Sequence, residues 1–147
     1  MMYRLKSNVV PVLFAAAVTL PGLWYPSQAQ VRATADVTCK QADGPLNYDC
    51  VVRLIDAKSK APLSGVTLSI GADMPSMPGV HHLRPAQAVE DAEKGTYRAR
   101  LVLDMHGEWA LQLNLSGPMR DRMVKLLRFE GADVTEPKPG ERSRHKH

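Results

Sequence analysis

Residues 109–115 read Trp-Ala-Leu-Gln-Leu-Asn-Leu, and this alternation of large apolar residues with small or polar ones decides the class of fold. A period of two places alternate side chains on opposite faces of a β-strand, whereas a helix has a period near 3.6. The tryptophan and the three leucines are therefore expected to face a core. The alanine, glutamine and asparagine are expected on the other face of the strand.

The same period recurs along about 100 residues of the chain, which is the size of one small domain. Clear alternation marks Tyr48–Ile55, Val66–Ile70 and Tyr97–Leu103, and weaker strands are expected at Ala35–Lys40, Leu83–Val89 and Met123–Glu130. Glycine- and proline-containing turns separate these runs. The spacing predicts an all-β fold, an immunoglobulin-like antiparallel β-sandwich of about seven strands. The pair Leu126-Leu127 breaks the alternation and predicts a β-bulge in the last strand.

The first 29 residues have the pattern of an export signal. Arg4 and Lys6 give a positive start, the apolar run Val9–Leu20 follows, and Ser27-Gln28-Ala29 offers a small-residue cleavage site. We therefore expect a cleaved signal peptide at 1–29 and a periplasmic protein without a stable membrane span. The alternative is an uncleaved N-terminal anchor. The apolar stretch extended to Tyr25 has 17 residues, close to the roughly 20 that a span needs.

The exported part is predicted to consist of a sandwich domain at 30–131 and a disordered charged tail at 132–147. The whole chain carries a formal charge of +4, but 30–131 contains 13 basic and 12 acidic residues. The folded part is thus nearly neutral. Its charge does not favour nucleic-acid binding, and no nucleic-acid partner is expected.

The chain has two cysteines, Cys39 and Cys50, which flank the turn signal Asp43-Gly44-Pro45. A lone pair in an exported protein is usually a disulfide. We expect a hairpin whose two strands are joined by this bridge. A metal or redox thiolate pair is the competing interpretation, but it would favour C-x-x-C spacing.

The stretch 74–82 reads Met-Pro-Ser-Met-Pro-Gly-Val-His-His and is the strongest pointer to a chemistry. Its prolines and glycine oppose regular structure, so it is expected to be an end loop of the sandwich. Asp104-Met105-His106-Gly107 forms a second turn. If the two loops meet, they combine soft thioethers with imidazoles, the donors that suit copper. The candidate metal ligands are Met74, Met77, His81, His82, Met105 and His106.

Two other interpretations stand beside copper binding. Methionine is flexible and often fills gaps at the end of a core, so these methionines are also candidates for packing. Alternatively Met74, Pro75, Met77 and Pro78 form an exposed apolar knob of a protein-interaction module, which docks without metal on a periplasmic or membrane complex. Asp104 and Glu108 flank a turn and could pair as acid and base, but two carboxylates beside a hairpin are ordinary surface residues. Catalysis is not expected, because no pocket-forming element or activated nucleophile accompanies them.

Three motifs together resemble the YtkA-like/FixH-like family. They are the loop G-A-D-M-P-S-M-P at 71–78, the strand G-x-Y-x-A-x-L at 95–101 and the strand G-E-W-x-L at 107–111. The resemblance spans roughly Tyr48 to Phe129. It implies an immunoglobulin-like sandwich outside the cytoplasm and a small, non-enzymatic accessory protein. Some members of that family are linked to copper delivery or to assembly of respiratory oxidases, and some are found beside metal-efflux systems.

The resemblance also implies partners and site residues. Met74, Met77 and His81 occupy the loop positions that match the family motif, which makes copper the expected ligand and a periplasmic or membrane complex for metal efflux or oxidase assembly the expected partner. FixH-type members are held by a substantial transmembrane helix. This chain instead begins with a signal-like segment, which argues against a role in oxidase assembly.

Overall fold

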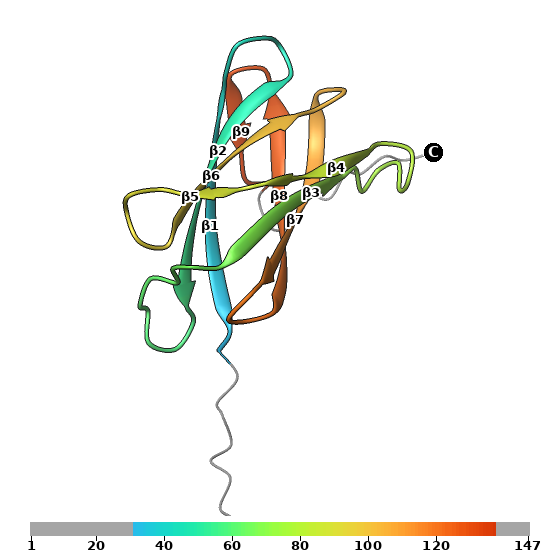
Figure 1. The fold of residues 1–147 in the computed structure, drawn as a ribbon. Helices are drawn as coiled ribbons and strands as arrows, with labels where there is room; N and C mark the ends of the chain where they lie inside the picture. Colours follow the sequence, from blue (N-terminus) through green and yellow to red (C-terminus); the bar gives the residue numbers. More distant parts are fainter. Residues whose placement is uncertain (1–30, 138–147) are drawn as a thin grey trace, which may run out of the picture.

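The computed structural model describes residues 31–137, which form two antiparallel β-sheets packed face to face (Figure 1). One sheet has the strand order β1-β2-β6-β5 and is built from Ala33–Gln41 (β1), Asn47–Asp56 (β2), Thr96–Val102 (β6) and Val89–Glu90 (β5). The other has the order β4-β3-β7-β8-β9 and is built from His82–Gln87 (β4), Thr67–Asp73 (β3), Gly107–Ser116 (β7), Asp121–Glu130 (β8) and Asp133–Thr135 (β9). The predicted all-β sandwich is confirmed. The predicted signal peptide lies outside the described residues.

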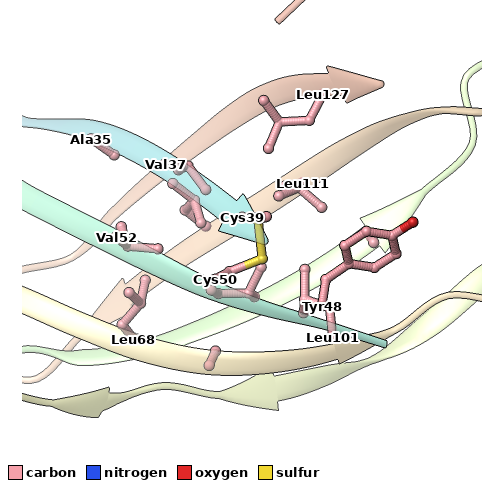
Figure 2. Packing of buried hydrophobic residues seen from close by; sticks show 14 of the residues in the cluster. Ala35, Val37, Cys39, Tyr48, Cys50, Val52, Leu68, Leu101, Leu111 and Leu127 are labelled. Atoms are coloured by element: carbon pink, nitrogen blue, oxygen red, sulfur yellow. A yellow bond between two sulfur atoms is a disulfide. The ribbon is translucent and has the colours of Figure 1, made fainter. Parts of the chain in front are cut away.

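The core lies between the sheets and contains the residues that the alternation assigned to it. Trp109, Leu111 and Leu113 on β7 are fully buried, while the intervening residues of that strand are only partly covered. Tyr48 on β2 packs edge-to-face against Phe129 on β8, with ring centroids 4.7 Å apart. Apolar side chains from both sheets thus interdigitate, as Figure 2 shows around the disulfide. This burial supplies the main favourable free energy of folding.

The disulfide between Cys39 and Cys50 is confirmed. The two residues lie directly opposite each other in the ladder of β1 and β2, with Cα atoms 4.1 Å apart, and the bridge faces the core (Figure 2). Pairing across the hairpin follows from the turn between the strands, which sets Gln41 against Tyr48. Such a bridge is typical of proteins that fold in an oxidising compartment outside the cytoplasm.

The weak strand expected at Leu83–Val89 is in fact two strands that belong to different sheets. β4 pairs with β3, whereas β5 pairs with β6. The chain crosses between the sheets at Ala88, whose N–H donates to the carbonyl oxygen of Leu68 at 2.9 Å. A sheet change cannot be read from alternation alone, because the side-chain period of two continues through it.

Two expectations about the end of the chain are wrong. Leu126-Leu127 contains no bulge, because β8 pairs with β7 without interruption from Phe129 to Asp121. Leu127 faces the core and Leu126 is simply an exposed apolar residue. In addition the tail predicted to be disordered from residue 132 begins with β9, which pairs with β8 through the turn at Gly131, while residues 138–147 lie outside the described part of the chain. A three-residue edge strand is too short to give a periodic signal.

Candidate metal site

The segment between β3 and β4 consists of two successive turns. The N–H of Met77 donates to the carbonyl oxygen of Met74 at 3.0 Å, and the N–H of Val80 donates to the carbonyl oxygen of Met77 at 3.2 Å. A proline occupies the second position of each turn, where its fixed φ is favourable. Gly79 takes the third position of the second turn with φ of 76°, the conformation that a type II turn requires. The prolines and glycine therefore place Met74 at the start of the first turn and Met77 where the two turns join.

Met74 is the anchor of this segment. Its side chain is only 2% exposed and belongs to the core cluster, and its N–H donates to Oδ1 of Asp73 at 3.0 Å. The Met74 methyl carbon lies 3.1 Å from the point where a Cβ on Gly107 would sit, so this methionine reaches the turn at residues 104–107. Met77 is half-buried and packs against the core. The proposed exposed knob is therefore wrong for Met74, while Pro75, Pro78 and Val80 are exposed.

The 104–107 turn connects β6 to β7, and Trp109 holds it in place. The indole Nε1 of Trp109 donates to the carbonyl oxygen of Met105 at 3.2 Å. Met105 itself is half-buried and packs against the core, which agrees with its inward parity in the sequence. Gly107 follows with φ of 136°, a conformation that other residues rarely adopt. A fully buried tryptophan thus sets the position of a methionine at the rim of the core.

His81 joins the loop at residues 74–80 to the turn at residues 104–107. Its Nδ1 lies 2.8 Å from Oδ2 of Asp104, and its ring stands edge-to-face to that of Trp109 with centroids 6.4 Å apart. The His81 side chain is 25% exposed and that of Asp104 is 47% exposed. Because Asp104 follows β6 and His81 precedes β4, this hydrogen bond links the ends of two strands from different sheets. The two loops that the sequence offered as a candidate metal site therefore meet at one end of the sandwich.

The other two histidines are directed elsewhere. His82 is exposed at the start of β4, where it pairs in register with Asp73. His106 has its Nε2 3.3 Å from the carbonyl oxygen of Pro45, in the turn between β1 and β2. Met74 therefore reaches the 104–107 turn at Gly107 and His81 bonds to Asp104 in the same turn, whereas His82 and His106 are directed elsewhere.

Asp104 is the site residue whose role the sequence did not indicate. The sequence offered it only as a partner of Glu108, yet the two carboxylates have different partners. Asp104 bonds to His81, whereas Glu108 lies 3.6 Å from the guanidinium of Arg128 on the neighbouring strand. In the sequence, the signal that points to Asp104 is its position beside Met105-His106. Its contact with His81 could not be predicted from that position, because it depends on how the two loops meet.

The donor set restricts which metals fit. Within residues 31–137, no three side chains of His, Cys, Asp and Glu lie close enough together to hold a metal ion. A site at the two turns would therefore depend on thioether sulfurs together with one imidazole. Thioethers are soft donors that suit Cu(I), whereas Zn²⁺, Mg²⁺ and Ca²⁺ prefer nitrogen, thiolate or oxygen ligands.

The fold and the site define a class of protein, a small disulfide-linked β-sandwich with a methionine- and histidine-bearing end. The sequence profile described as YtkA-like matches residues 28–114, more than half of the chain, and the protein belongs to the YtkA-like family. No curated protein and no solved structure matches the chain. In the part of the chain that the structure describes, no helix has the length and apolarity needed to cross a membrane.

Proposed function

We propose that this protein is a non-enzymatic periplasmic accessory protein that binds Cu(I) through Met74, Met77, Met105 and His81 and passes the ion to a partner or takes it from one. One observation carries this proposal. The two methionine-bearing turns meet at one end of the sandwich, where the 2.8 Å contact between His81 and Asp104 joins them. Family membership and the disulfide are consistent with an accessory role outside the cytoplasm.

The chemistry of the residues supports exchange of the ion rather than a fixed structural site. Thioether sulfurs are neutral, soft ligands that hold Cu(I) without the charge of a thiolate. His81 supplies a fourth donor through an imidazole nitrogen, a borderline ligand that Cu(I) also accepts. The site lies at the rim of the core, and the partly exposed His81 gives a partner access to it.

The test is a titration of the purified protein with Cu(I) in competition with a chelator of known affinity. Every described strand lies within residues 33–135, so protein lacking residues 1–29 retains the whole described sandwich. The variant Met74→Leu/Met77→Leu keeps the side-chain volume, and its loss of stability is expected to stay below about 1.5 kcal/mol for each substitution. Its affinity for Cu(I) is expected to fall at least about tenfold, the effect of losing about 1.4 kcal/mol of binding free energy.

The matched control is Met119→Leu/Met123→Leu, which replaces two half-buried methionines that pack against the core outside the two turns. This variant is expected to bind Cu(I) like the parent protein. Residues 30–147 contain a single tryptophan, Trp109, so quenching of its fluorescence offers a second readout close to His81. Equal Cu(I) affinity in all three proteins would disprove the site.

A second candidate function is docking on a periplasmic or membrane complex without metal. The observation that favours it is the apolar tip formed by Pro75, Pro78 and Val80, in which Val80 is 70% exposed. If the tip is a docking surface, Val80→Asp abolishes retention of the partner in a pull-down, and Met74→Leu/Met77→Leu does not. Val89→Asp is the control, because Val89 is 71% exposed but lies on β5. Equal retention by both aspartate variants would exclude the tip.

A further inference from the structure

The imidazole of His81 has its two nitrogens in different environments. Nδ1 lies 2.8 Å from the carboxylate oxygen Oδ2 of Asp104. An ionised carboxylate only accepts hydrogen bonds, so Nδ1 must carry the proton in this contact. In the neutral ring the other nitrogen, Nε2, then carries the free lone pair. The contact therefore selects one of the two tautomers and leaves Nε2 as the atom that can bind a metal.

The surroundings of His81 fix the ring as well as its proton. The ring of Trp109 stands at 75° to the imidazole, and Trp109 is itself held by its hydrogen bond to the carbonyl oxygen of Met105. The turn that ends at Val80 precedes His81 directly. His81 thus has a carboxylate on one nitrogen and an aromatic wall beside its ring, whereas the neighbouring His82 is exposed on β4.

We propose that Asp104 is a positioning residue, which holds His81 as the Nδ1-protonated tautomer and so presents Nε2 to Cu(I). This inference rests on the proposed function, because it names the atom through which the same site takes its metal. Histidines that bind metals commonly donate their second N–H to a carboxylate, and loss of that partner typically weakens metal affinity 10- to 100-fold. Asp104 also connects β6 to the start of β4, so it orients the loop that carries His81.

The first experiment uses metal-free protein and reads the tautomer directly. Long-range ¹H–¹⁵N NMR spectra of the imidazoles distinguish a protonated ring nitrogen from an unprotonated one. For His81 the expected result is a protonated Nδ1 and an unprotonated Nε2. In Asp104→Leu the carboxylate is gone, and the Nε2-protonated form is expected to become dominant. An Nε2-protonated His81 in the parent protein, or an unchanged tautomer in Asp104→Leu, would overturn the inference.

The second experiment compares Cu(I) affinities by chelator competition. Asp104→Asn is expected to bind Cu(I) about 10- to 100-fold more weakly than the parent. Glu108→Gln is the matched control, since it removes a carboxylate near the same turn that faces Arg128 instead of His81. His82→Asn controls for the neighbouring imidazole. Both controls are expected to retain the parent affinity, and all variants are checked for an unchanged denaturation midpoint.

The two experiments separate the inference from the function on which it rests. If the parent binds Cu(I) and Asp104→Asn binds it equally well, the role of Asp104 is overturned and the copper proposal stands. If the parent does not bind Cu(I), the copper proposal is overturned, and the presentation of Nε2 to copper falls with it. The tautomer of the metal-free protein still shows whether Asp104 orients His81.

Discussion

The two ends of the sandwich use their side chains in opposite ways. At the end away from the methionine turns, the hydroxyl of Tyr97 accepts a hydrogen bond from the N–H of Val66 at 3.1 Å and donates one to the carbonyl oxygen of Leu63 at 2.8 Å. Glu90 there accepts from the N–H groups of Gly65 and Gly95. These side chains satisfy backbone groups that would otherwise lose their partners on folding.

The methionine end carries potential metal donors that make no structural hydrogen bond among the described residues. His81 uses only one nitrogen, in its contact with Asp104, and the thioethers of Met74, Met77 and Met105 are weak acceptors that no folded backbone needs. One end is therefore explained by stability alone. The surplus of soft donors at the other end is what the copper proposal explains, and substitutions at the two ends should separate stability from metal binding.

The disulfide gives the largest expected effect, because it is a covalent link within the core. Cys39 and Cys50 are 11 residues apart and join β1 to β2 inside the core. Replacing both with alanine is expected to lower the free energy of unfolding by about 3 kcal/mol, since the bridge restricts the unfolded chain. Urea denaturation of oxidised, reduced and Cys39→Ala/Cys50→Ala protein measures this.

The same variant also tests whether the methionine sulfurs, and not the cysteine sulfurs, bind Cu(I). Because the cysteine sulfurs are bonded to each other, Cys39→Ala/Cys50→Ala is expected to keep its Cu(I) affinity under conditions where it remains folded. A folded variant that no longer binds Cu(I) would contradict the assignment of the site to the methionine turns.

Tyr97→Phe gives the next largest effect and concerns only the far end. The substitution leaves the Val66 N–H and the Leu63 carbonyl without their partner, which is expected to cost about 1–3 kcal/mol in the free energy of unfolding. Tyr48→Phe is the control, because the Tyr48 hydroxyl makes one hydrogen bond, to the carbonyl oxygen of Gly131, and its loss should cost about 0.5–1.5 kcal/mol. Denaturation measures both. The comparison of the ends fails if Tyr97→Phe also lowers Cu(I) affinity.

Gly107→Ala addresses the methionine end with an effect of similar size. Alanine is strained at φ of 136°, and its Cβ would lie 3.1 Å from the methyl carbon of Met74, which must shift. A loss of about 1–3 kcal/mol in stability is expected from the strained backbone. Gly79→Ala is the control, because its φ of 76° is also unfavourable but its Cβ would meet nothing within 4 Å.

The distinguishing measurement for these glycines is the methyl NMR signal of Met74. Gly107→Ala is expected to shift the signal and weaken Cu(I) binding, whereas Gly79→Ala should leave the signal in place. If neither variant moves it, the contact between the two turns does not control the position of Met74.

The sequence predicted the fold better than the site, for a physical reason. Alternation records which face of a strand is buried, so the core strands could be predicted from it, and the turn signal between the two cysteines added the hairpin disulfide. The same pattern does not record strand partners, and it therefore missed the change of sheet at Ala88 and the short strand β9. The meeting of the two turns could be proposed but not the choice between His81 and His82. That choice depends on where the turn ends and β4 begins.

The smallest expected effect is the contribution of the Glu90 carboxyl, at the end away from the methionine turns, to the pH dependence of the free energy of unfolding. Its hydrogen bond from the N–H of Gly65, and more weakly that from Gly95, lowers the pKa of the Glu90 carboxyl below its ordinary value. A carboxyl with a lowered pKa in the folded protein stabilises the fold above its unfolded pKa of about 4.3, and this stabilisation is lost as the pH falls toward the folded pKa. The free energy of unfolding should therefore fall on acidification below about pH 5. In Glu90→Gln, whose amide oxygen still accepts hydrogen bonds but does not titrate, that fall should be shallower. Urea denaturation at several pH values compares the two slopes, and identical slopes would show that Glu90 plays no part in the acid response of this end.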